Sequence, residues 1–158
     1  MTVGVDTYVT VDEADTYIST HYVSSSAEQQ RWSGLSVNDK TAYLLNALAH
    51  IERLPIKGRK AVYWQPLAFP RLLDIYDIAV PVNVKAAQIE LALWLSDTAK
   101  QAEQAKRQDL QRQGVVSFGI GDLSENYGGV RISNNAALRC EKVQLLLLNE
   151  MSGGYHTC

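Results

Sequence analysis

Apolar residues recur three and four positions apart in several stretches of the chain, a spacing that places them on one face of a helix. The first stretch follows Thr10, which forms a capping-box pair with Glu13, and it ends before the serines at 24–26. A short turn around residues 29–32 precedes Ser36, which caps the second stretch. The pattern therefore predicts two N-terminal helices with well-marked starts.

The second predicted helix ends near Pro55 and Gly58, residue types that stop helices. Its apolar positions predict a wide buried face, made by Ala42, Leu45 and Ala49 with, one position offset, Tyr43, Ala47 and Leu54.

The longest predicted helix opens at Val80-Pro81, with proline near its first turn, and continues to Gln113. It is apolar on most sides as far as Leu95 and polar from Asp97 onward. We expect its first half to lie in the core and its second half to be solvated.

The last part of the chain predicts a hairpin and a final helix. Residues 115–120 and 125–132 have strand-like composition, and Ser133 caps a helix that continues to about Met151. Its apolar set is Leu138, Leu145, Leu146 and Leu148. Because successive helical residues are about 100° apart, four consecutive leucines at 145–148 cannot all face one core. We expect Leu147 to face away.

Together these elements predict an all-α fold, a small bundle of about four helices, one of them long, with a short β-hairpin projecting near residues 115–132. We expect one helical domain over residues 1–151 and a flexible tail over residues 152–158, after the Gly153-Gly154 pair.

The segment from Gln65 to Arg71 is rich in both proline and large apolar residues. Pro66 and Pro70 exclude a regular helix or an inner strand there. We therefore expect Leu67 and Phe69 to be buried from an irregular backbone, with Arg71 bonded to backbone carbonyls or to a carboxylate.

Composition is that of a globular protein: 158 residues, 46% hydrophobic and 20% charged, with a net charge of −2. Residues 1–39 carry a local net charge of −5 and the remainder +3, which could bring complementary ends of two subunits together. No apolar run approaches the roughly 20 residues of a membrane helix, and residues 1–20 do not resemble a signal peptide. We expect no membrane partner, and a reducing cytoplasm suits the two distant cysteines, Cys140 and Cys158.

Catalytic and cofactor motifs are not found. Gly119-Ile120-Gly121 lacks the third glycine of a dinucleotide-binding turn, and the histidines His21, His50 and His156 are scattered. Asp12, Glu13 and Asp15 are explained as a helix start. We expect no enzyme activity, no cofactor and no metal site.

A basic cluster is the main candidate for nucleic-acid binding. Arg53, Lys57, Arg59 and Lys60 surround Gly58, and Tyr63 and Trp64 follow. Cations beside aromatic rings are typical of single-strand binding. The alternative, which one cluster in a net acidic chain favours, is a solvated turn whose aromatic rings pack with the proline-rich segment.

Residues 8–18, Tyr-Val-Thr-Val-Asp-Glu-Ala-Asp-Thr-Tyr-Ile, resemble the opening of a tailed-phage family whose members are often labelled DnaT-like single-stranded-DNA-binding proteins. The similarity continues through Trp32, the helix at 40–54, and Gln65 to Arg71, and it covers roughly residues 8–150. Phe69 stands where the family often has tryptophan, and the segment after Arg71 is unusually hydrophobic.

The resemblance implies a structural adaptor at the head–tail junction of a long-tailed phage virion, made in the host cytoplasm. Such proteins form a ring, commonly of twelve subunits, beneath the portal and above a stopper or tail-completion protein, and double-stranded DNA passes through without sequence recognition. On this reading, contacts between subunits involve Phe118, Tyr127, Phe69 and Arg71. Contacts with the portal involve Leu147, Met151, Tyr155 and His156. The alternative is a DnaT-like accessory protein that binds single-stranded DNA through the basic cluster.

Overall fold

The structure is a computed structural model that describes residues 1–72, 79–112, 117–120, 123–126 and 135–152. The chain divides into two compact units. The first unit comprises Met1–Ser96 and Asn135–Cys158, and the second comprises Asp97–Asn134.

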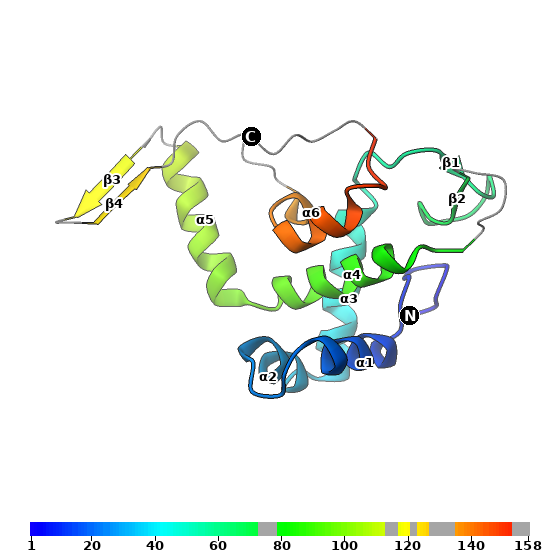
Figure 1. The fold of residues 1–158 in the computed structure, drawn as a ribbon, viewed down its shortest axis with the longest axis horizontal. Helices are drawn as coiled ribbons and strands as arrows, with labels where there is room; N and C mark the ends of the chain where they lie inside the picture. The colour runs from blue at the N-terminus through cyan, green and yellow to red at the C-terminus, as the bar shows by residue number, and fades with distance from the viewer. Residues whose placement is uncertain (73–78, 113–116, 121–122, 127–134, 153–158) are drawn as a thin grey trace. The chain divides into compact units, whose positions relative to one another are not determined.

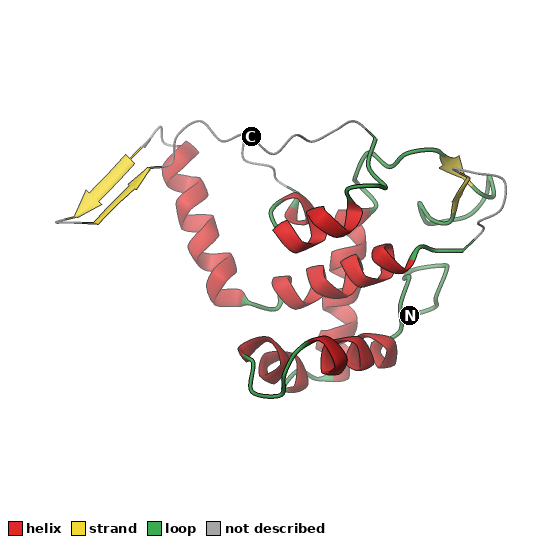
Figure 2. Cartoon of the chain, viewed as in Figure 1, coloured by secondary structure: helices red, strands yellow, loops and turns green. Residues whose placement is uncertain are grey.

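Helices build most of the first unit (Figures 1 and 2). In chain order they are α1 (Val11–His21), α2 (Ala27–Ser33), α3 (Val37–Ile51), α4 (Val82–Leu95), the 3-10 turn η1 (Ala136–Leu138) and α6 (Glu141–Leu147). The strands β1 (Arg59–Lys60) and β2 (Arg71–Leu72) pair as a two-stranded antiparallel ribbon. The prediction of a mainly helical fold is therefore confirmed, and the β1–β2 ribbon is an element that the sequence analysis did not predict.

The α4 helix is the centre of the first unit and packs against α3, α6 and α1 (Figure 1). Eight consecutive residues of α4, at 86–93, are buried, as is Val84; the buried set is Val84, Ala86, Ala87, Gln88, Ile89, Glu90, Leu91, Ala92 and Leu93. A helix that is buried all round must satisfy its polar side chains internally. Gln88 does so, since it donates to Thr7 Oγ1 (3.0 Å) and Leu44 O (2.9 Å) and accepts from the Tyr8 amide (3.0 Å).

The predicted helix starts are confirmed. Thr10 Oγ1 accepts from the Glu13 amide at 3.0 Å, and the Glu13 carboxylate accepts from the Thr10 amide at 2.7 Å. Ser36 Oγ caps α3 by accepting from the Asp39 amide at 3.1 Å. Ser26 caps α2 in the same way, so a short helix stands where a turn was predicted.

The predicted buried face of α3 is partly wrong. Ala42, Leu45 and Ala49 are exposed, whereas the buried residues of this helix are Lys40, Leu44, Ala47, Leu48 and Ile51. The buried apolar residues Leu44, Ala47, Leu48 and Ile51 recur three and four positions apart on one face of the helix. Lys40, four residues before Leu44, extends this face because it forms an ion pair with Asp15.

The long helix predicted from residue 80 to residue 113 forms two helices. After α4, Ser96 Oγ donates to the Leu93 carbonyl at 2.7 Å, and Asp97 Oδ1 accepts from the Lys100 amide at 3.1 Å. These side chains compete with the backbone for its hydrogen bonds and so interrupt the helix. The second part, α5 (Thr98–Arg112), belongs to the second unit.

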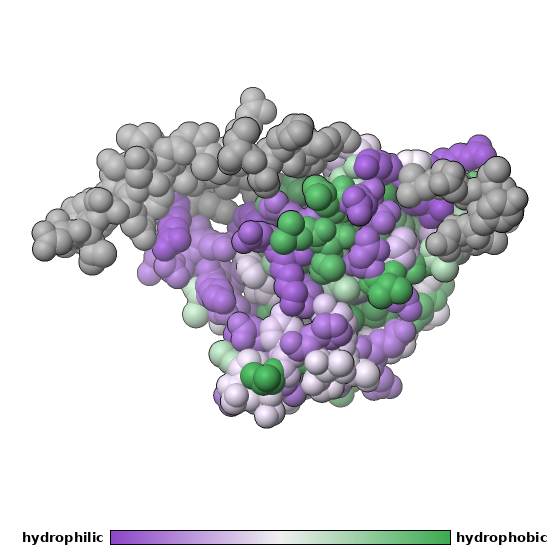
Figure 3. Space-filling model, in the orientation of Figure 1, coloured by the Kyte–Doolittle hydropathy of each residue, from purple (hydrophilic) through white to green (hydrophobic). Residues whose placement is uncertain are grey.

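The C-terminal helix is shorter than predicted. Asn135 caps η1 and α6 begins only after Cys140, while the predicted cap Ser133 lies outside the described residues. Leu147 is fully buried, so the prediction that it faces away from the core is wrong. Leu145 and Leu148 are instead 66% and 51% exposed, and Figure 3 shows hydrophobic residues at the surface in the region of α6.

The second unit contains α5 and an antiparallel hairpin of β3 (Ser117–Ile120) and β4 (Leu123–Asn126). Phe118 pairs with Glu125 in the register of this hairpin. The hairpin falls within the predicted range of 115–132. On α5, an ion pair between Arg107 and Glu103 (2.9 Å) spans one turn of the polar surface.

Within the described residues, no helix combines the length and the apolar character needed to cross a bilayer.

Candidate functional site

The segment that joins β1 to β2, residues 61–70, carries the most exposed aromatic side chains of the described chain; it is called the aromatic loop below. Tyr63 is 94% exposed and Trp64 is 83% exposed. Their rings therefore do not pack with the proline-rich segment, and the reading of this cluster as a solvated turn with packed aromatics is wrong. Two neighbouring flat apolar surfaces face water instead.

The other half of the aromatic loop is fixed in the core. Leu67, Ala68 and Phe69 are buried, as predicted for Leu67 and Phe69. The Phe69 ring meets the Tyr8 ring edge to face, with centroids 5.9 Å apart. Since Phe69 is enclosed by its own subunit, it has no free face for the inter-subunit contact predicted for it.

Glu52, at the end of α3, anchors this buried half. The Tyr8 hydroxyl donates to the Glu52 carboxylate, which also accepts from the Ala68 amide at 2.8 Å. The same hydroxyl accepts from the Phe69 amide at 3.1 Å. Burial, together with Glu52, holds the pKa of the Tyr8 hydroxyl well above its ordinary value, so the phenol stays neutral and can donate.

This anchor joins the two segments that carry the family resemblance most specifically, residues 8–18 and 65–71. Sequence reasoning did not single out Glu52. A carboxylate just after a helix, within a cluster of cations, reads equally well as a surface charge.

The four predicted DNA-facing cations occupy different positions. Arg53, Lys57 and Arg59 are exposed, and Lys57 Nζ donates to the Asn149 carbonyl at 3.2 Å. Lys60 is half-buried, and its ammonium donates to the carbonyls of Gln65 (3.0 Å) and Pro66 (3.3 Å) inside the aromatic loop. Lys60 therefore holds the loop, whereas Arg59 and Lys57 offer charge to the solvent.

Arg71 donates through Nη1 to the Gly58 carbonyl at 2.9 Å, which confirms the predicted backbone bond. Arg71 is half-buried on β2 and pairs in register with Lys60 on β1. Its guanidinium thus closes the base of the ribbon that carries the aromatic loop.

His50 lies near the end of α3, three residues before Arg53. Burial, with the charges of Arg53 and Arg139, lowers the pKa of His50. His50 is half-buried and its main-chain oxygen accepts from Asn135 Nδ2 at 2.9 Å, so it packs beside the start of η1.

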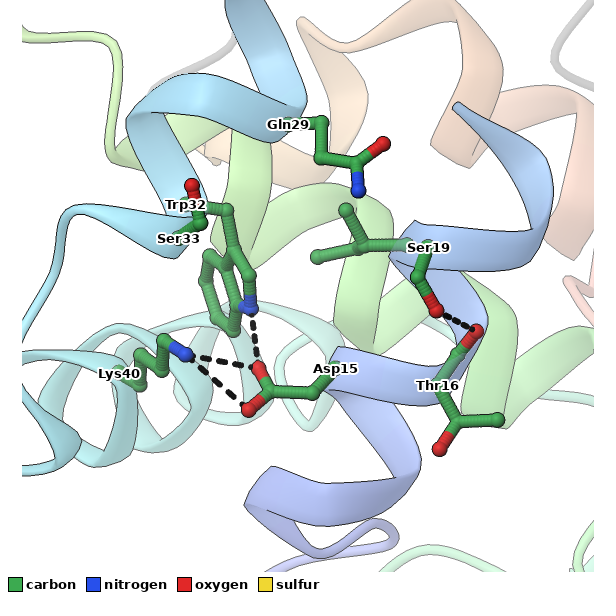
Figure 4. Close-up of a pocket in the computed structure, with 8 residues that line it drawn as sticks. Asp15, Thr16, Ser19, Gln29, Trp32, Ser33 and Lys40 are labelled. Atoms are coloured by element: carbon green, nitrogen blue, oxygen red, sulfur yellow. Dashed lines mark hydrogen bonds and ion pairs between the residues drawn. The ribbon is translucent and has the colours of Figure 1, made fainter. Parts of the chain in front are cut away.

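A pocket between α1, α2 and α3 is a second candidate site (Figure 4). Trp32 and Lys40 both point at Asp15 in this view: Trp32 Nε1 lies 2.6 Å and Lys40 Nζ 2.9 Å from Asp15 Oδ1. Because the carboxylate is occupied by these donors, the arrangement fastens three helices together and leaves no free acid or base for chemistry.

Pairing also reduces the acidic character of the N-terminal segment. Glu13 lies 3.2 Å from Lys85 Nζ, and Asp15 is neutralised by Lys40. The local net charge of −5 read from the sequence is therefore partly balanced by cations from later segments.

A buried carboxylate network lies on α4. Glu90, which is 3% exposed, accepts from the hydroxyls of Tyr17 (2.9 Å) and Tyr22 (2.6 Å) and pairs with Lys142 Nζ (2.6 Å). Sequence reasoning missed this network, although an acid within an otherwise apolar helix was a visible clue.

Leu147 and Met151, predicted to contact a portal, are both buried in the core. The backbone of Met151 forms an isolated antiparallel β-bridge with that of Ile56. Tyr155, His156 and Tyr127 lie outside the described residues, as does the side chain of Phe118. Over the described chain, no cluster of three or more histidine, cysteine or acidic side chains could hold a metal ion.

A family model described as "Putative DnaT-like ssDNA binding protein" matches residues 1–156. The chain belongs to this DnaT-like family. No curated protein and no solved structure matches it. The matched residues cover both units of the structure and include the aromatic loop.

Proposed function

We propose that this DnaT-like protein binds single-stranded DNA at the aromatic loop, with Tyr63 and Trp64 as stacking surfaces and Arg59 and Lys57 as phosphate partners. The observation that carries the proposal is the near-complete exposure of two adjacent aromatic rings beside exposed cations. The description of the family supports it.

Stacking accounts for a preference for single strands. In a duplex the base faces are covered by their neighbours, whereas a single strand can place a base against a side-chain ring. Each stacked base contributes about 1–3 kcal/mol, and every base has such a face, so we expect weak sequence preference. Phosphate contacts from Arg59 and Lys57 add an attraction that weakens as salt rises.

The test is the affinity of the purified protein for a labelled oligo(dT) of about 12 nucleotides, measured by fluorescence anisotropy. Trp64→Ala and Tyr63→Ala should each weaken binding roughly 5- to 150-fold, the equivalent of about 1–3 kcal/mol. Leu145→Ala, which truncates an exposed apolar side chain on α6, is the matched control and should bind like the parent protein. Unchanged affinity in both aromatic variants would refute the proposal.

The salt dependence tests the role of the cations. Arg59→Gln should reduce the slope of log affinity against log salt by about 0.7, the value for one phosphate contact with a single strand. Arg107→Gln on α5 removes the same charge from a helix turn in the second unit and should leave the slope unchanged.

A second candidate function is the head–tail adaptor that the sequence resemblance implies. It is favoured by the second compact unit, in which a two-stranded hairpin accompanies a polar helix. A lone hairpin is marginal in water, so an adjacent subunit in a ring would give Phe118 and Tyr127 a packing surface. In this role the protein would be part of the virion and contact the portal, the protein below it and passing double-stranded DNA.

The adaptor role predicts assembly, which the DNA-binding role does not require. Light scattering and electron microscopy of the purified protein, with and without portal, would detect a closed ring. A monomer that stays monomeric with portal present would argue against this second function.

A further inference from the structure

We propose that Gln65 is a positioning residue that sets the conformation of the aromatic loop before nucleic acid binds. This inference rests on the proposed function, because it assigns the cause of ring presentation at that same site. It concerns a residue that has no charge and that we do not place in contact with DNA.

The carboxamide of Gln65 makes three hydrogen bonds, all within the aromatic loop. Nε2 donates to the carbonyls of Leu67 and Pro70, each at 2.9 Å, and Oε1 accepts from the Val62 amide at 3.0 Å. The Gln65 amide also donates to the Val62 carbonyl at 3.1 Å. One side chain therefore ties the exposed start of the loop to its buried end.

These bonds enclose the exposed rings. Val62 lies directly before Tyr63 and Trp64, and Gln65 lies directly after them, so the four residues form a turn closed on both sides. Lys60 adds a second tie through the carbonyls of Gln65 and Pro66. Leu67 and the Phe69 region, fixed by Glu52, give the turn a rigid base.

Only a side chain with both donors and an acceptor can make this set of bonds. Methionine has a similar length and no amide, so Gln65→Met removes the three bonds with little change in volume. Glutamate keeps the shape but places a carboxylate against two carbonyl oxygens, where it cannot donate.

Fixing a loop in its bound conformation raises affinity, because the ordering cost is met during folding and not during binding. A loop released from Gln65 would sample conformations in which the two rings no longer present adjacent faces. Affinity should then fall while the phosphate contacts remain.

The experiment compares the full-length parent protein, Gln65→Met and the control Gln30→Met, an exposed glutamine on α2. We expect Gln65→Met to bind the labelled oligo(dT) about 3- to 30-fold more weakly, with an unchanged salt slope. In the DNA-free protein, hydrogen exchange of the Val62 amide should become faster, and the urea midpoint should fall because three hydrogen bonds are lost, with the unfolding transition still cooperative. Gln30→Met should match the parent in all of these measurements.

Parental affinity in Gln65→Met would overturn the inference, as would weaker binding with unchanged Val62 exchange, since Gln65 would then be a contact residue. A reduced salt slope would also overturn it. The proposed function and the inference can fail separately. If Trp64→Ala and Tyr63→Ala both bind normally, the proposed function fails and the inference with it. If either variant binds weakly and Gln65→Met binds normally, only the inference fails.

Discussion

Replacing Glu90 by alanine should be among the most destabilising single changes in the first unit. Glu90 lies on α4. Its carboxylate accepts from Tyr17 of α1, from Tyr22 directly after α1, and from Lys142 on α6. Removing one partner of a buried ion pair typically costs about 3–5 kcal/mol. Because the Lys142 side chain is 51% exposed and can turn to water, we expect a somewhat smaller loss, about 2–4 kcal/mol.

Urea unfolding followed by circular dichroism measures this change directly. The matched control is Glu103→Ala, which breaks the exposed pair with Arg107 on α5 and should cost no more than about 0.5 kcal/mol. Combining Glu90→Ala with Lys142→Met should cost less than the sum of the single changes, by about 0.5–3 kcal/mol, if the two side chains interact as the structure has them. A loss below about 1 kcal/mol for Glu90→Ala, or strict additivity in the double variant, would refute this reasoning.

Two further predictions concern stability. Phe69→Ala should lower the free energy of unfolding by about 3–5 kcal/mol, because the ring is buried against Tyr8, and a urea midpoint equal to that of the parent would contradict this. Burial and the nearby Glu90 raise the pKa of Tyr17 and of Tyr22 to about 12, above the ordinary value of 10.0, so the folded state prefers the protonated phenols. Their contribution should be complete below about pH 10 and disappear as the pH rises toward about 12; stability against urea should fall over that interval, and the fall should shrink in Tyr17→Phe combined with Tyr22→Phe.

Local features were predictable from the sequence. Thr10 and Ser36 cap helices because a short side-chain oxygen next to free amide groups needs no distant partner. Burial of Leu67 and Phe69 followed from the prolines that exclude regular structure around large apolar residues. The hairpin within 115–132 followed from strand-like composition next to glycines.

Features that depend on a distant partner were not predictable. The position of Lys40 inside the core requires Asp15 on another helix, and the position of Glu90 requires two tyrosines and a lysine from separate segments. The prediction that Leu147 faces away from the core was wrong for a related reason. A run of four leucines leaves the outward-facing positions undetermined, and they depend on the short helix α6 packing against α4.

Sequence analysis identified the residues of the candidate site but not how they are arranged in space. The cations and the two aromatic residues were identified, but their sequence allowed either buried or exposed rings. Gln65 and Glu52 decide between these outcomes, because they close the turn and fasten its buried half. Such roles depend on where backbone carbonyl and amide groups lie in space, and composition does not determine those positions.

Charge around the aromatic loop distinguishes a nucleic-acid ligand from a second copy of the chain. A protein contact that covered Trp64 would draw Arg59 and Lys57 out of water and would need acidic partners for them. The N-terminal acids are poorly placed for that purpose. Glu13 and Asp15 already pair with Lys85 and Lys40. Asp12, Glu28 and Asp39 stand in the first turns of α1, α2 and α3, where they complement the helix dipoles, and Asp6 accepts a hydrogen bond from the Thr2 amide. A single strand brings one phosphate with every base, so it supplies the missing charge and the stacking face together. For this reason the aromatic loop suits single-stranded DNA better than it suits the N-terminal surface of a neighbouring subunit.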